Sequence, residues 1–198
     1  MSELFGSLSL GMGVFIYCLY FRQVARGMSK PNLFTWTLWL LIGWLNFATY
    51  MPLVGNDPFK GSMTVVSAVM LTLLYIYIFR RGTYVSLCRF DAVVFVLALG
   101  VLGFWQVTGN GLIANLLLQV CFILSFIPTL RALVRDEAYE SPTVWMLAVV
   151  TYGFNILAIA FDEVSGLAEF AFPVVNGVLG NGSVLVVTLW FRRYESWF

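Results

Sequence analysis

The 198-residue sequence contains no histidine, and this shortage argues against much of enzyme chemistry. Histidine is a frequent general acid or base and the commonest metal ligand, so neither kind of site is favoured. The three cysteines, Cys18, Cys88 and Cys121, lack the spacing of a metal site or a disulfide framework. The sequence also has no glycine-rich phosphate loop and no serine or cysteine beside a base. We therefore expect neither an enzyme nor a cofactor or metal site.

Charged residues are also scarce, at 11% of the chain, whereas about a quarter of a soluble domain is charged. Hydrophobic residues instead make up 61%, and the mean hydropathy is +0.89. Apolar runs recur along the chain, each long enough to cross ~30 Å of hydrocarbon as a helix. We predict an all-α integral membrane protein with seven transmembrane helices, at residues 4–21, 33–53, 62–79, 90–107, 112–130, 143–161 and 170–191.

The positive charges lie almost entirely on one side of these predicted helices. Ten of the eleven Lys and Arg residues fall in the first, third and fifth loops or after the last helix, and only Lys60 falls on the other side. Loops rich in Lys and Arg stay in the cytoplasm, so we predict an outside N-terminus and an inside C-terminus. The plasma (bacterial inner) membrane is the expected location. A net charge of +1 carries no signature of nucleic-acid binding.

Two segments of the chain repeat the same residue types at one constant offset in the numbering. The matching pairs are Arg22 and Arg131, Arg26 and Arg135, Trp36 and Trp145, and Asn46 and Asn155. The pattern indicates two three-helix units, residues 1–86 and 109–198, joined by a fourth helix at 87–108. Because each unit has an odd number of spans, the linker helix restores the direction of the second copy. This predicts a 3+1+3 arrangement of parallel repeats.

This layout, with its outside N-terminus, resembles the SWEET and PQ-loop superfamily of small-solute transporters. In that family a proline-glutamine pair ends the first helix of each repeat; here residues 127–131 read IPTLR and residues 19–23 read LYFRQ, so only Pro128 is kept. Residues 175–180 of the seventh run, VNGVLG, are similar to the family's asparagine-glycine motif, which implies a solute contact for Asn176. Thr64 stands at the matching place in the third helix. Nicotinamide riboside transporters share the layout.

Several polar residues within the predicted helices are candidates for a solute site, because buried polar groups are costly in a bilayer. Asn46 and Asn155 each lie about ten residues past a tryptophan, roughly 15 Å along the helix and near the midplane. Their amides suit a neutral ligand, but they are equally suited to hydrogen bonds between helices. Trp39 precedes Asn46 by seven residues, nearly on the same face, where it could stack on a flat ligand or pack. Asn115 and Gln119 lie one turn apart on the fifth helix.

The seventh run has its own pattern. Asn176 and Asn181 stand among Gly177, Gly180 and Gly182, behind Pro173. The pattern predicts either a kinked or partly unwound helix that exposes backbone groups to a ligand, or close helix packing through small residues.

Three tryptophans near the inner edge, Trp36, Trp145 and Trp190, are expected to form an interfacial belt. On the outer side, Asp162, Glu163 and Glu169 form an acidic cluster. It is expected to be a solvated loop, with two open alternatives: attraction of a cationic solute, or closure of an outer gate with Lys60.

No ionisable residue is predicted near the middle of the membrane, which argues against proton coupling and favours passive transport. We expect a uniporter for a small neutral polar solute, sugar-like or nucleoside-like, that moves through a central path between the repeats. Two alternatives stay open: a membrane receptor that does not transport, and an accessory or structural subunit. The expected partners are the solute, membrane lipids and a possible homo-oligomer, with no nucleic acid.

Overall fold

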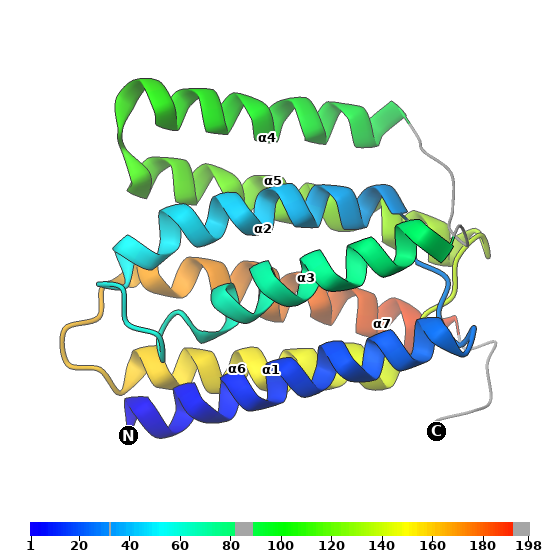
Figure 1. The fold of residues 1–198 in the computed structure, drawn as a ribbon, viewed down its shortest axis with the longest axis horizontal. Coiled ribbons are helices and arrows are strands. Elements are labelled where there is room, and N and C mark those ends of the chain that lie inside the picture. The colour runs from blue at the N-terminus through cyan, green and yellow to red at the C-terminus, as the bar shows by residue number, and fades with distance from the viewer. Residues whose placement is uncertain (32, 82–88, 192–198) are drawn as a thin grey trace.

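The computed structural model describes residues 1–198 except 32, 82–88 and 192–198, and these residues form helices joined by short loops (Figure 1). A helix stands at each of the seven predicted runs, so the all-helical prediction is confirmed. The helices are α1 (Ser2–Ala25), α2 (Leu33–Leu53), α3 (Ser62–Arg81), α4 (Arg89–Thr108), α5 (Gly111–Val134), α6 (Pro142–Ala160), a 3-10 turn η1 (Leu167–Phe170), a π-helix η2 (Pro173–Asn181) and α7 (Gly182–Trp190).

Among the described residues, five segments are long and apolar enough to cross a membrane: α1, α3, α5, α6 and Leu167–Trp190. The apolar part of α4 is shorter, Ala92–Thr108, and α2 is a 21-residue helix without a charged residue. Many large apolar side chains of these helices are exposed rather than buried. A soluble protein rarely exposes such surfaces, so the structure is consistent with an integral membrane protein.

Helix ends follow local sequence signals. Pro142 is the first residue of α6, where its missing N–H costs nothing. The proline of the family-like motif, Pro128, lies inside α5, which continues to Val134. Proline is tolerated within membrane helices because neighbouring groups satisfy the freed carbonyl. The helix therefore does not end at this motif.

The helices pack in related pairs. α1 contacts α6 and α3, and α5 in the same way contacts α2 and the η2–α7 segment. α2 also packs against α3, as α6 does against η2 and α7. α4 lies at one edge of the molecule beside α5, with further contacts to α2 (Figure 1).

The turns after α1 and α5 have the same backbone geometry. Gly27 and Asp136, which are related by the same offset as the repeated pairs, are both left-handed, with φ of 72° and 62°. Asp136 is one of two residues other than glycine in this region among those described. After these turns the two loops meet, because the Lys30 N–H donates to the Tyr139 carbonyl at 3.0 Å. Lys30 and Tyr139 are also equivalent positions of the repeat.

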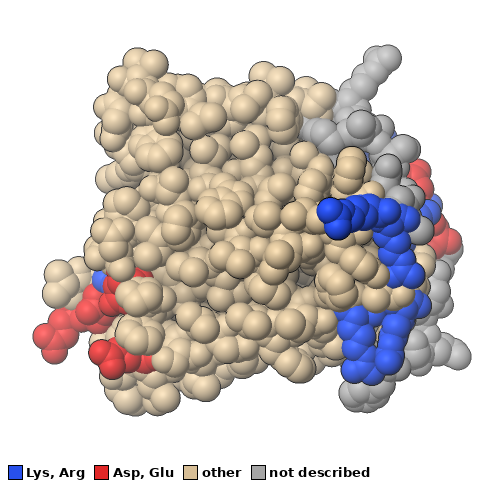
Figure 2. All heavy atoms as spheres, viewed as in Figure 1, with Lys and Arg blue, Asp and Glu red and all other residues tan. Residues whose placement is uncertain are grey.

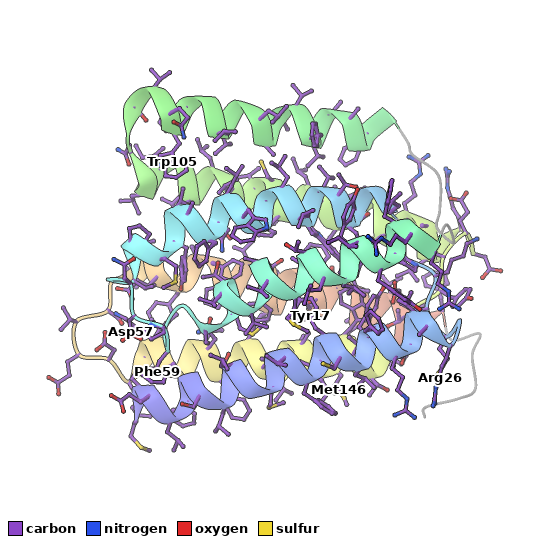
Figure 3. The ribbon with its side chains drawn as sticks, viewed as in Figure 1. Tyr17, Arg26, Asp57, Phe59, Trp105 and Met146 are labelled. Carbon is purple, nitrogen blue, oxygen red and sulfur yellow. The ribbon has the colours of Figure 1, made fainter. Side chains whose placement is uncertain are left out.

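Charged side chains gather at the two ends of the helices (Figure 2). We call the end where α1 and α5 finish and α2 and α6 begin the basic end, because Arg22, Arg26, Arg131 and Arg135 lie there. We call the opposite end, with loops 54–61 and 161–166, the acidic end. Arg26 and Asp57 mark the two ends in Figure 3.

Candidate functional site

A central cavity lies inside the helical bundle. Its empty volume is about 750 Å³, counting the part open to solvent. Residues of α1, α2, α3, α5, α6 and η2 line it, whereas α4 contributes none. The polar and aromatic lining residues are Tyr17, Tyr20, Trp36, Trp39, Asn46, Thr64, Ser67, Phe122, Phe126, Trp145, Tyr152, Phe172, Asn176 and Asn181.

Aromatic rings make up much of this lining. Trp39 lies at the centre of a cluster, with its ring centroid 5.1 Å from that of Trp36, 5.0 Å from that of Phe126 and 6.1 Å from that of Trp145. Its indole N–H donates to Ser125 Oγ at 2.8 Å, so the ring is held in place. Trp39 thus presents an immobilised aromatic surface to the cavity, as a stacking partner should.

The prediction of an interfacial tryptophan belt is wrong for two of its three members. Trp36 and Trp145 are each only 5% exposed and line the cavity, whereas Trp190 is 81% exposed. The reason is helix rotation. Both rings face the interior of the helical bundle, where Tyr20 of α1 contacts each of them, and depth along a helix does not reveal which way a side chain faces.

Asn46 is fully buried and joins three helices. Its Nδ2 donates to Thr64 Oγ1 on α3 at 2.8 Å, and its Oδ1 accepts from Asn115 Nδ2 at 3.0 Å and from Gln119 Nε2 at 3.4 Å on α5. Asn115 also donates to Thr49 Oγ1. Asn46 lines the cavity, but Asn115 and Gln119 lie behind it, outside the lining. These three amides therefore form a network between helices.

Asn155 has different partners from Asn46. It is fully buried on α6, and its Nδ2 donates to the Lys60 carbonyl at 2.8 Å and to Ser62 Oγ at 3.3 Å. It does not line the cavity, so the two repeated asparagines do not converge on one site. Asn155 instead ties α6 to the loop before α3, which is the helix-joining alternative for this residue.

The seventh helix is irregular but remains wound. The π-helix η2 spans Pro173–Asn181, and Asn181 Nδ2 donates to the Asn176 carbonyl at 2.6 Å across one wide turn. Asn176 Nδ2 donates to the Tyr152 hydroxyl at 2.7 Å, and both asparagines line the cavity. A Cβ added at Gly177 or Gly180 would overlap a ring of α6 or α5. The segment thus combines a π-bulge, often found at functional sites, with close packing.

Two groups of polar cavity residues were missed by sequence reasoning. Tyr17 on α1 and Tyr152 on α6 bring phenol hydroxyls to the lining, with Tyr17 about midway along the molecule (Figure 3). Ser67 on α3 is 6% exposed, and its hydroxyl completes no hydrogen bond among the described residues, although it lies close enough to act on the phenol groups of Tyr17 and Tyr152. Tyr17, Tyr152 and Ser67 each lie in an apolar run where serine and tyrosine are common. The sequence therefore did not single them out as cavity residues. A buried unpaired hydroxyl facing a cavity is a natural ligand contact.

At the acidic end, Lys60 connects the two halves of the chain. Its Nζ lies 2.7 Å from Asp162 Oδ2 and 3.1 Å from Glu169 Oε2. Partial burial lowers the pKa of Lys60, but the hydrogen bonds to the two carboxylates outweigh it and raise the pKa. The hydrogen bond from Lys60 lowers the pKa of Asp162. Of the three expectations for the acidic cluster, the structure shows the contact with Lys60.

At the basic end, the turns after α1 and α5 close against each other. Besides the Lys30–Tyr139 bridge, the Tyr139 hydroxyl donates to the Gly27 carbonyl at 2.8 Å. The Tyr20 hydroxyl, which lines the cavity, donates to Glu140 Oε1 at 2.6 Å. Contacts between the two halves of the chain thus lie at both ends of the helical bundle.

No three His, Cys, Asp or Glu side chains within the described ranges come close enough to hold a metal ion. What the cavity offers chemically is aromatic surface, hydroxyls and amides. Comparisons of the chain with protein families, with curated proteins and with solved structures each found no match.

Proposed function

We propose that this protein is a membrane uniporter for a small neutral polar solute, which passes through the central cavity between residues 1–86 and 109–198. The observation that carries the proposal is a cavity lined by six helical segments with breakable polar contacts between its halves at each end. A structural subunit needs no such cavity, and a fixed receptor needs closure at only one end. Passage would require the contacts of the acidic and basic ends to break in turn.

The 3+1+3 arrangement of the SWEET and PQ-loop superfamily is part of this proposal. Three features support it: the related helix pairs, the equal turns at Gly27 and Asp136, and the bridge between Lys30 and Tyr139. Residues at equivalent positions meet each other only near a two-fold axis, and the bridge joins such a pair. The absence of α4 from the lining suits its role as a linker.

The orientation is also proposed, with the basic end in the cytoplasm. The gathering of Lys and Arg at that end supports it through the positive-inside rule (Figure 2). The single lysine of the opposite end, Lys60, is paired with Asp162 and Glu169 and so adds little free positive charge there.

The lining favours a nucleoside-like over a sugar-like solute. Each sugar hydroxyl is both donor and acceptor, and leaving one unpaired in a buried site costs ~1–3 kcal/mol. The polar groups of Asn46 and the N–H of Trp39 are already bonded within the protein. Among the fully buried polar atoms of the described cavity residues, Ser67 Oγ and Trp145 Nε1 complete no hydrogen bond. A solute with a flat ring can stack on Trp39 and needs fewer hydrogen bonds than a sugar. It therefore fits the few polar groups available in this cavity better than a sugar does.

The test is uptake of a panel of nucleosides and sugars by proteoliposomes that contain the purified protein. We expect saturable uptake of a nucleoside without an ion gradient. Ser67→Ala should weaken uptake at low solute concentration by roughly two- to tenfold, because one hydrogen bond contributes ~0.5–1.5 kcal/mol. Ser9→Ala is the matched control, because the Ser9 hydroxyl is also buried and unpartnered but lies outside the lining.

Uptake of sugars alone would contradict the solute class. Binding of a panel member without flux would favour the receptor alternative, and neither binding nor flux of any neutral solute would end the proposal.

A further inference from the structure

A buried carboxyl group lies at the closed basic end of the cavity. Glu140 precedes α6 in the loop that pairs with residue 30, and its Oε1 accepts the hydrogen bond from Tyr20 on α1. Its other oxygen, Oε2, is buried without a hydrogen-bond partner among the described residues. The carboxyl group therefore lies between the two halves of the chain at the point where they meet.

The groups around this carboxyl group are neutral. Ser29 of the first loop and Trp145 of α6 lie close enough to influence it, but the Ser29 hydroxyl and the indole N–H complete no hydrogen bond. Tyr20 is the only other titratable group that acts on it within the described part of the chain. Lys30 and Tyr139 join beside it through backbone atoms, and no described Lys or Arg forms an ion pair with it. A carboxylate held here without a cation is unfavourable.

We propose that Glu140 is a proton-binding site that controls the basic end: this end is closed when Glu140 is protonated, and loss of the proton favours its opening. In the step, the O–H bond of the carboxylic acid breaks, and the proton passes to water on the basic side. The carboxylate is then hydrated as the two loops separate. Solute passage consequently depends on pH on that side, whereas nothing in the sequence indicated that a buried carboxyl group takes part in passive transport.

The direction of the pH dependence follows from the protonation of the two forms. Burial raises the pKa of Glu140 to about 7 in the closed form, against a smaller lowering by Tyr20, Ser29 and Trp145. After opening, an exposed glutamate has a pKa of ~4.3. Between these values the closed form holds a proton that the open form has lost, so acid favours closure and alkali favours opening. The full range of the effect is about five hundredfold in the open-to-closed ratio, because the two pKa values differ by about 2.7.

Accessibility of a cysteine tests this without any solute. Val144 lines the cavity at the start of α6 and is 4% exposed. A Val144→Cys variant, in a full-length chain whose native cysteines are replaced by serine, is treated in sealed vesicles with a membrane-impermeant maleimide from the basic side. Dividing its labelling rate by that of Glu137→Cys, an exposed residue of the same loop, removes the intrinsic pH dependence of thiols.

We expect the rate ratio to rise at least tenfold from pH 5.5 to pH 8. Glu140→Gln, permanently neutral, should keep the low ratio at both pH values. Tyr20→Phe should move the midpoint to higher pH, because the hydrogen bond from Tyr20 lowers the pKa of Glu140. This midpoint shift keeps the test informative where Glu140→Gln fails to fold.

A flat ratio in the parent, or an equal rise in Glu140→Gln, would overturn the proposal. Either result is distinguishable from failure of the transporter proposal, which would show as absent uptake with the pH-dependent labelling intact.

Discussion

Replacing Asn46 with leucine tests whether the buried amides of this protein hold its helices together. Asn46 connects α2 to α3 through Thr64 and to α5 through Asn115 and Gln119. Leucine abolishes all three hydrogen bonds, and because it has the same number of side-chain heavy atoms, its two methyl groups take the places of the amide oxygen and nitrogen beside the cavity. We therefore expect a loss of stability that comes from the lost bonds rather than from a clash.

The magnitude follows from the partners that remain. Hydrogen bonds between membrane helices contribute on average about 0.6 kcal/mol each, so losing three costs about 2 kcal/mol. Asn115 keeps Thr49 Oγ1 as an acceptor, and Gln119 keeps the Asn115 carbonyl, so their donors are not left unpaired. Only the Thr64 hydroxyl loses its donor. We therefore expect a loss of about 2 kcal/mol in the free energy of unfolding. The larger penalty for leaving several buried polar groups unpaired does not apply.

The assay is the free energy of unfolding in mixed detergent micelles, measured for the parent and for Asn46→Leu. Ser67→Ala is the control, because it removes a buried hydroxyl of the same cavity that has no partner, and its stability should stay within about 0.5 kcal/mol of the parent. An unchanged stability in Asn46→Leu would refute the network. An equal loss in both variants would show that any change to the lining destabilises the protein.

Two further predictions concern packing and orientation. Gly180→Ala should destabilise the protein by ~1–3 kcal/mol, because the new Cβ would overlap the Phe126 ring. Gly153→Ala has open space around the new Cβ and should stabilise α6 by up to ~1 kcal/mol. Thermal unfolding of both variants measures the two effects. A cysteine at Gly166 should react with an impermeant reagent outside intact cells and one at Glu137 should not, and the reverse pattern would disprove the proposed orientation.

The helices could be predicted from the sequence because each apolar run must satisfy its own backbone in a membrane. Continuous hydrophobicity therefore determines where a helix begins and ends, and the boundaries agree within a few residues. The form of the seventh helix was harder to predict. Pro173 and its glycines indicated an irregular segment, but the π-helix depends on close packing against Tyr152 and Phe126, which come from other helices.

The polar site was predicted less well, because position along a helix says nothing about which neighbour a side chain meets. Asn46 and Asn155 occupy equivalent positions in the repeat, yet one contacts a threonine and two amides and the other a backbone carbonyl and a serine. Of their partners Ser62 and Thr64 on α3, only Thr64 has a polar counterpart at the matching position of the seventh helix, and that counterpart is Asn176. The partners of the two asparagines therefore differ, although the sequence places them at one constant offset.

Glu140 shows why the same reasoning missed a buried carboxyl group. A glutamate two residues before a helix, in a loop rich in charged residues, is normally solvated, and nothing in residues 135–141 indicates otherwise. Its burial arises only because the equivalent turn of the first half pairs with this loop and brings Tyr20 against it. If the protein is built from two similar halves, as proposed, groups near the two-fold axis are covered by the partner half. A search for ionisable residues should therefore include the loops that meet at such an axis as well as the middle of each span.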